Sequence, residues 1–187
     1  MFGPQTHPST MNVVKFCLLP VVAFFVIAGL GGYFWANSLP AEWEVTREHT
    51  IAASPEQIHP YITDLRRWED WGIWYEREPE MLIEYTGEPG VGQVSEWIGK
   101  DGAGKNEIIA SDVAIGITTL TSFNDFTPFE GEITYTPQGD KTLIRWHAHG
   151  TAQNVGEKLF GYAADGMMGP DYQVNLQRLG ALVEASK

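Results

Sequence analysis

The stretch from residue 45 to residue 75 constrains the fold most, because three kinds of local signal follow one another within it. Residues 45–52 alternate with a period close to two, which predicts a half-buried β-strand. The sequence SPEQ at residues 54–57 has the form of a capping box with proline at the first helical position, which predicts a helix start. Three indoles then recur at steps of three and must share a core or line a cavity, namely Trp68, Trp71 and Trp74.

Six further segments have the short, turn-bounded character of strands. Because strands that follow one another directly are joined most simply by hairpins, they predict an antiparallel sheet of about seven strands. The six segments are Met81–Tyr85, Val91–Gly99, Lys105–Asp112, Ala114–Phe123, Phe129–Thr136 and Thr142–Gly150.

The C-terminus predicts an amphipathic helix that covers this sheet. Gly169-Pro170-Asp171 is typical of a helix start, and an apolar stripe follows at helical spacing on Tyr172, Leu176, Leu179 and Val183. The preceding segment, Asn154–Met168, is compatible with either a helix or an ordered loop.

Four motifs indicate a family. They are the segment "aSPeqIhpYItDl", the following W-x-x-W step, "TPfeGeitYtp" and "gdKTlirW". From about Trp43 to the C-terminus the chain resembles the polyketide cyclase/dehydrase-like, START-related (SRPBCC) superfamily. The resemblance implies an α+β helix-grip fold, in which a curved antiparallel sheet wraps around a long C-terminal helix.

The N-terminal part predicts a membrane anchor. Residues 16–35 contain no charge and are as long as a bilayer span requires. We therefore expect a flexible tail at 1–12, a transmembrane anchor at 13–36, a linker at 37–42 and a helix-grip domain at 43–187. Two alternatives stay open, a secretory signal cleaved near residues 36–38 and a buried core helix. A single-pass anchor with the domain outside the cytoplasm is the orientation we expect.

Charge and cysteine content exclude some functions. All 24 acidic residues follow Pro40, whereas one of the 12 basic residues, Lys15, precedes it. A surface this acidic repels nucleic acid, so no nucleic-acid partner is expected. The one cysteine, Cys17, lies in the apolar segment, so the domain has neither a disulfide nor a cysteine-based zinc site.

The inward faces of the predicted strands and helix carry more aromatic and methionine surface than a small core needs. If the Trp146 face of its strand points inward, these side chains enclose an apolar site with polar tips at Gln93 and Ser95. The alternative is that they fill the interior completely. The predicted ligand-binding residues are Trp71, Trp74, Trp97, Ile133, Tyr135, Ile144, Trp146, Met168, Tyr172 and Leu176.

Catalytic and metal-binding signals are weak. Asp64, Glu69, Asp70 and Glu96 are candidates for acid–base chemistry by position only, and no catalytic residue is assigned. The pair His147-x-His149 could chelate a metal, but two ligands are too few and the sequence indicates no third. We therefore predict no metal and no cofactor.

Three functions remain possible. The first is a membrane-anchored binding protein that holds an apolar small molecule or lipid between sheet and helix, and it is favoured because no catalytic constellation is recognisable. The second is an enzyme of the cyclase or dehydratase type that uses the same cavity, as the family resemblance implies. The third is a protein-interaction module without a ligand.

Overall fold

A computed structural model describes residues 10–186, with side chains from residue 20 onward. Its contacts divide the chain into two units that meet between Leu39 and Pro40. In the first unit the helix α1 (Thr10–Ser38) contains a stretch, Pro20–Ser38, that is long and apolar enough to cross a membrane. Length and composition are the basis of that statement, and a signal sequence shares both properties.

The boundaries of the first unit differ slightly from those expected. Residues 1–9 of the predicted tail lie outside the described residues, and residues 10–12 already belong to α1. The helix continues through Asn37 to Ser38, so the predicted linker shrinks to residues 39–41 before the first strand. A tail and a linker of mixed polarity give no sharp helix limits, which explains the shift.

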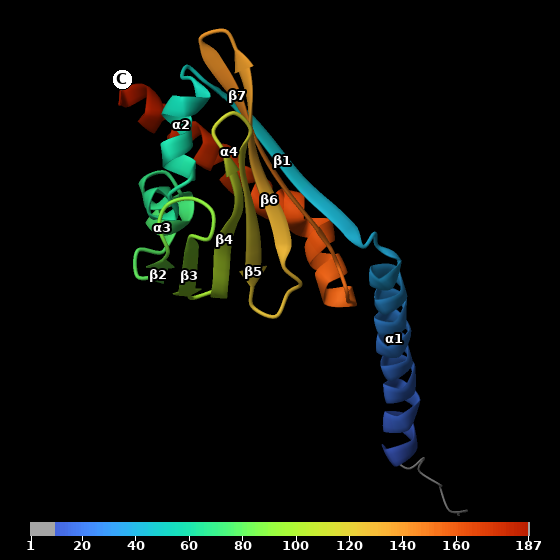
Figure 1. Cartoon of the computed structure of the whole chain (residues 1–187). Helices are drawn as coiled ribbons and strands as arrows, with labels where there is room; N and C mark the ends of the chain where they lie inside the picture. The colour runs from blue at the N-terminus through green and yellow to red at the C-terminus, as the bar shows by residue number, and fades with distance from the viewer. Residues whose placement is uncertain (1–9, 187) are drawn as a thin grey trace, which may run out of the picture. The chain divides into compact units, whose positions relative to one another are not determined.

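The second unit is built on the seven-stranded antiparallel sheet that the sequence predicts (Figure 1). The strand order is β1-β7-β6-β5-β4-β3-β2, so the first strand closes against the last and all other neighbours are hairpins. The strands are β1 (Glu42–Ile51), β2 (Leu82–Thr86), β3 (Val94–Gly99), β4 (Gly102–Asp112), β5 (Gly116–Phe123), β6 (Phe129–Gln138) and β7 (Lys141–Thr151).

The two faces of the sheet differ in polarity. On β7, Ile144, Trp146 and Ala148 are buried on the concave face, as predicted, whereas Arg145 points outward and is exposed. The pairing of Ile133 with Trp146 extends the buried face onto β6. The period-two pattern therefore places the core correctly, because one slip of register would have moved every side chain to the other face.

Three short helical segments connect β1 to β2, namely α2 (Pro55–Ile62), the 3-10 helix η1 (Leu65–Asp70) and α3 (Ile73–Arg77). α2 starts at Pro55 as predicted, and the Gln57 side chain accepts a hydrogen bond from the Ser54 amide at 3.0 Å. The Trp68 indole donates to the Ile62 carbonyl at 3.0 Å, which ties η1 to the end of α2. These ties hold the tryptophan segment against one end of the sheet.

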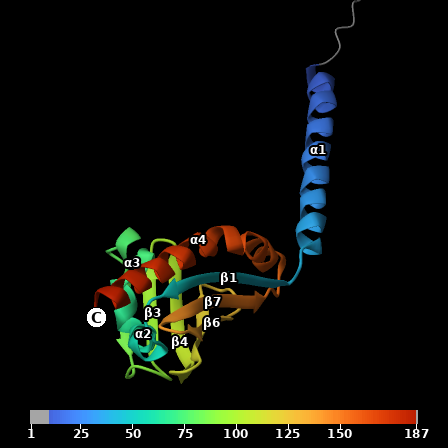
Figure 2. The ribbon, with the colours of Figure 1, turned by 90° about the horizontal axis from the view of Figure 1, so that it is seen from above.

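The C-terminal helix is twice as long as the sequence predicts. α4 (Val155–Ala185) runs without interruption through Pro170, and it packs across the concave face, mainly against β1 (Figure 2). The Asn154 side chain caps it by accepting from the Glu157 amide at 3.0 Å. Pro170 is exposed, so water can hydrate the carbonyl that loses its helical partner, and packing of the apolar stripe outweighs the cost.

Candidate functional site

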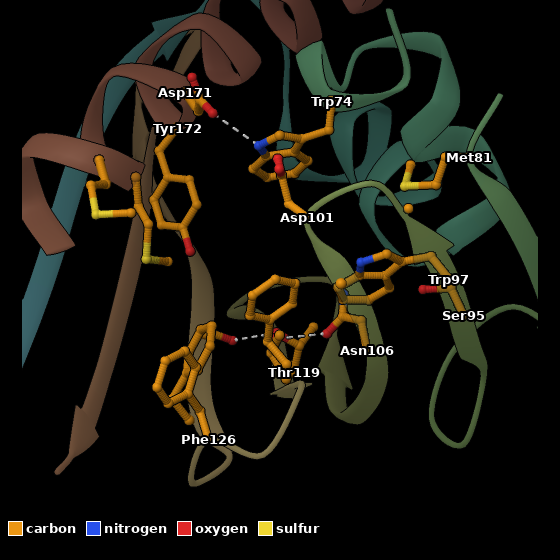
Figure 3. A pocket seen from close by; sticks show the side chains of 18 of the residues that line it. Trp74, Met81, Ser95, Trp97, Asp101, Asn106, Thr119, Phe126, Asp171 and Tyr172 are labelled. Carbon is orange, nitrogen blue, oxygen red and sulfur yellow. Dashed lines mark hydrogen bonds between the residues drawn. The ribbon is translucent and has the colours of Figure 1, made fainter. Parts of the chain in front are cut away.

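A cavity of about 450 Å³ lies between the sheet and the N-terminal half of α4 (Figure 3). Its lining residues come from all seven strands, η1, α3 and α4. Cavities of this size accommodate a small organic molecule. The helix-grip fold thus leaves part of its concave face unfilled.

One wall of the cavity is a stack of aromatic rings. Trp146 of β7 and Tyr172 of α4 lie parallel, with centroids 4.1 Å apart and an interplanar angle of 5°. Trp74 meets both rings edge-on, at 6.1 Å from Trp146 and 6.3 Å from Tyr172. Such ring pairs prefer defined geometry, so this wall presents a well-defined apolar surface.

Asp171 holds the same wall in place from outside the stack. Its Oδ2 accepts from the Trp74 indole at 3.0 Å and from the Arg77 guanidinium at 2.8 Å. The carboxylate is 14 % exposed, so its charge is balanced by Arg77 in a partly desolvated position. Asp171 therefore joins α4 to α3, and the contacts indicate a structural role for it.

The opposite side of the cavity is a polar floor formed by inward residues of β3, β4 and β5. Asn106 and Thr121 are joined by a hydrogen bond of 3.1 Å from the hydroxyl to the amide oxygen. Thr119 donates to the Gly131 carbonyl at 3.1 Å. Ser95, on β3, is 6 % exposed and lies beside them. The cavity thus combines an aromatic wall with a polar patch on β3, β4 and β5.

Several polar groups of the lining keep unused hydrogen-bonding capacity. Among the described residues, no protein partner is found for the Tyr172 hydroxyl, the Ser95 hydroxyl or the Asn106 amide nitrogen. Figure 3 shows the Tyr172 hydroxyl and the Trp97 indole nitrogen pointing toward the open space. Burial raises the pKa of the Tyr172 phenol well above its usual range, so this group is a neutral donor at physiological pH. All of these groups can donate a hydrogen bond to a ligand.

Four aromatic residues form a second cluster where β1, the β5–β6 connection and α4 meet. Phe126 stacks on Phe160 with ring centroids 5.3 Å apart. Trp43 meets Phe129 and Phe160 edge-on, with centroid distances of 5.2 and 5.4 Å. All four line the cavity. They extend its apolar wall to the beginning of α4.

Glu157 ties the β5–β6 connection to the start of α4. Its carboxylate accepts from the Thr127 amide at 3.2 Å, from the Gln153 amide at 2.6 Å and from the Asn154 side chain at 2.9 Å. These donors, the Gln153 amide foremost, lower the pKa of the Glu157 carboxyl below its usual range. The group is therefore ionised at neutral pH and is poorly suited to donate a proton.

The predicted binding residues separate into two groups of five. Those that line the cavity are Trp74, Trp97, Trp146, Met168 and Tyr172. The other five lie in the packed core and do not line it, because α2, η1 and the C-terminal half of α4 fill that part of the concave face. They are Trp71, Ile133, Tyr135, Ile144 and Leu176, and none is more than 8 % exposed.

The polar tips separate in the same way. Ser95 lines the cavity, but Gln93 is fully buried outside it and forms hydrogen bonds within the core. Its Oε1 accepts from the Leu65 amide at 2.7 Å, and its Nε2 donates to Asp64 at 2.8 Å. Among the lining residues that the sequence analysis did not select are Trp43, Trp68, Tyr75, Met81, Ile83, Asn106, Thr119, Thr121, Phe123, Phe126, Phe129, Phe160 and Met167.

A separate cluster lies on the convex face of the sheet. The structure adds a third candidate ligand that the sequence did not indicate, because Glu132 of β6 pairs with His147 of β7. One candidate ligand atom from each of Glu132, His147 and His149 lies within 4.8 Å of the others. The argument against a metal site, that two ligands are too few, therefore does not apply to the folded chain.

Comparisons with known proteins agree with this architecture. Residues 42–184 match the family described as polyketide cyclase / dehydrase and lipid transport, so the chain belongs to that family, and its fold is the helix grip. No curated protein gives a significant match.

Solved structures with low sequence identity share the fold. Norcoclaurine synthase from Thalictrum flavum, in complex with dopamine and hydroxybenzaldehyde, gives a TM-score of 0.61 at 14 % identity and covers 100 % of this chain and 98 % of its own. Protein CV1439 from Chromobacterium violaceum gives a TM-score of 0.56 at 15 % identity, and the match covers 75 % of this chain and 96 % of that protein. TTHA0849 from Thermus thermophilus gives a TM-score of 0.56 at 18 % identity, and the match covers 77 % of this chain and 99 % of that protein.

Proposed function

We propose that the second unit binds an apolar small molecule that carries hydrogen-bond-accepting oxygen atoms, such as carbonyl or carboxylate groups. The observation that carries this proposal is the combination of an aromatic-lined cavity with polar groups that face it and have no protein partner among the described residues. A ligand that displaces water from the cavity must pair these groups, since leaving them unpaired would then cost free energy, and this favours a ligand with matching acceptors. The family description, which names polyketide cyclases and lipid transport, supports the same class of ligand.

The arrangement of the cavity suggests how the molecule lies. Its apolar part would contact Trp146 of β7 and Tyr172 and Met168 of α4, where ring stacking provides a flat surface. Its oxygen atoms would accept from Ser95, Asn106 or the Tyr172 hydroxyl. A molecule of this shape gains from burial of apolar area and from a few directed hydrogen bonds, which is how most small-molecule sites combine affinity with specificity.

An enzyme of the cyclase type is the second candidate, and the Tyr172 hydroxyl is the observation that favours it. A neutral phenol in an apolar cavity can polarise a substrate carbonyl by donating to its oxygen. Four carboxylates line the cavity, and none is a buried group free to act as a general acid or base. Asp171 is paired with Arg77, Glu157 is held ionised by its donors, Glu78 accepts from the Lys100 amide, and Asp101 is exposed. Binding is therefore the function that the geometry supports best.

We further infer that α1 anchors the binding unit in a membrane, with the unit outside the cytoplasm. The apolar stretch Pro20–Ser38 supports an anchor, and the ligand class supports it too, because apolar molecules partition into bilayers. Resistance of the full chain to carbonate extraction, together with protease access to the binding unit in intact cells, would support both statements. Release by carbonate would contradict the anchor.

The binding proposal is tested by filling the cavity and identifying what is lost. Thr121 lines the cavity, whereas its neighbour Ser122 lies on the other face of β5, so Thr121→Phe and Ser122→Phe add the same side chain inside and outside. The full chain and both variants are purified in detergent, and molecules released from them are analysed by native mass spectrometry and extraction. We expect an apolar, oxygen-bearing molecule in the wild type and in Ser122→Phe, but not in Thr121→Phe.

Each other outcome has a definite meaning. Equal retention by all three proteins would contradict the cavity as the site. Empty proteins that also fail to take up fatty acids and aromatic ketones would contradict the binding function. Chemical conversion of the bound molecule on incubation would favour the enzyme over the binding protein.

A further inference from the structure

The convex face of the sheet holds a cluster that the cavity does not use. His147 and His149 are two residues apart on β7, so both side chains leave the same face of one rigid strand. Their rings lie 5.0 Å apart with an interplanar angle of 31°. Glu132 stands beside His147 on β6, and all three side chains are partly buried. Three ligands from two hydrogen-bonded strands are thus brought together by the register alone.

We propose that Glu132, His147 and His149 bind a divalent transition-metal ion of the Zn²⁺ type. Two imidazoles and one carboxylate form a donor set that zinc accepts, with the remaining position open to water or another ligand. The ligand atoms lie within 4.8 Å of one another, whereas a tetrahedral ion requires about 3.3 Å. Side-chain rotation would have to close that difference, and the partial exposure of all three residues leaves room for it.

The surroundings orient one of the imidazoles for metal binding. The Thr46 hydroxyl on β1 lies 2.8 Å from Nδ1 of His147. If Nδ1 donates to this hydroxyl, the lone pair of the ring is on Nε2, which is then free to ligate. Metal-bound histidines regularly make such a contact with their other ring nitrogen, and it fixes both tautomer and orientation. Thr46 is therefore a positioning residue in this proposal.

The local charge also favours a cation. His149 is flanked in register by Glu44 of β1 and Glu130 of β6, both exposed. The same face is hollowed beside His147 and His149, with Glu42 and Glu44 in the lining of the depression. The neighbouring cation, Arg145, lies 3.8 Å from Glu48, which offsets its repulsion. The depression gives the ion access from solvent, and the carboxylates raise its local concentration.

Calorimetric titration of the tag-free full chain with ZnCl₂ tests the site. We expect saturable binding of one ion per chain, reduced at least tenfold in affinity by Glu132→Gln and by His149→Ala, and reduced several-fold by Thr46→Val. Glu84→Gln removes an exposed carboxylate on β2, far along the sheet from β7, and should leave binding unchanged. Absence of saturable binding would overturn the proposal, as would binding that Glu132→Gln and His149→Ala leave unchanged.

A second measurement needs no variant and so does not depend on variants that fold. In the wild-type chain with labelled histidine rings, ZnCl₂ should shift the ring resonances of His147 and His149 and leave those of His49 and His59 in place. MgCl₂ at the same concentration should shift none of them, because magnesium prefers oxygen ligands. Shifts at His49 or His59 without shifts at His147 and His149 would overturn the assignment.

Discussion

The two halves of the concave face are built from the same kinds of residue but pack differently. In the half covered by α2, η1 and the end of α4, Trp71, Ile144 and Leu176 are completely buried. In the other half, Trp74, Trp97 and Met168 are partly exposed around the cavity. Trp146 lies at the boundary. Its ring centroid is 5.9 Å from that of Trp71 on the filled side and 4.1 Å from that of Tyr172 on the hollow side.

The difference teaches that the cover, rather than the sheet, decides where the cavity lies. Three helical segments meet over one half and leave no room. Over the other half α4 is joined to α3 by the Asp171 contacts with Trp74 and Arg77, and residues of both helices border the cavity instead of filling it. If this is correct, substitutions in the filled half should mainly change stability, and substitutions in the hollow half should mainly change binding.

The sharpest test compares two tryptophans. Trp71→Ala removes a fully buried indole from the filled half and should lower the free energy of unfolding by about 3–5 kcal/mol. Trp97→Ala removes a half-buried indole from the cavity wall and should cost less than about 1.5 kcal/mol, because space is already present beside it. Urea unfolding of the full chain, followed by far-UV circular dichroism, measures both. Equal losses of unfolding free energy in the two variants would contradict the difference between the filled and hollow halves.

A polar pair on one strand segment gives the next largest contrast. Gln93→Leu removes the acceptor of the Leu65 amide and should cost about 1–3 kcal/mol, because that amide stays buried and unpaired. Ser95→Ala, two residues away, removes a hydroxyl without a partner among the described residues and should stay within about 0.5 kcal/mol. The same unfolding experiment applies. A large loss for Ser95→Ala would show that the hydroxyl serves the fold rather than the cavity.

A smaller effect, with a definite dependence on pH, is expected at Glu157. Glu157→Gln should cost about 1–2 kcal/mol at pH 7, because a charged acceptor shared by several donors becomes a neutral one. The folded-state pKa is lower than the unfolded value of about 4.3, so the carboxylate stabilises the fold above that value. This contribution is lost as the pH falls through the folded-state pKa. The difference between wild type and variant should therefore shrink on acidification, and a constant difference would exclude the carboxylate charge as its cause.

The sheet and its inner face could be predicted from the sequence because period-two alternation and turn residues are local signals. The length of α4 could not, since Pro170 and the glycines of 156–169 locally disfavour a helix that packing against β1 stabilises. The starting point of α2 was predictable because its capping residues are adjacent in the sequence.

The candidate site was predictable only in part. Residue type identified an aromatic interior. Trp71 and Trp74 are only three positions apart, but Trp71 lies in the packed core and Trp74 lines the cavity, because different elements cover them. Phe126 and Phe160 were missed because they come together from a connection and a helix start. Glu132 was missed because it meets His147 only through the β6–β7 register.

The smallest expected effect on stability is also the most direct test of the hollow half. Tyr172→Phe keeps the ring that stacks on Trp146 and removes a hydroxyl with no protein partner among the described residues, so the free energy of unfolding should change by less than about 0.5 kcal/mol. If that hydroxyl donates to the bound molecule, its loss should lower affinity about two- to tenfold. Native mass spectrometry of the full chain after serial dilution measures the fraction that retains the co-purified molecule. Unchanged retention would leave the apolar wall as the determinant of binding and would remove the main argument for a catalytic phenol.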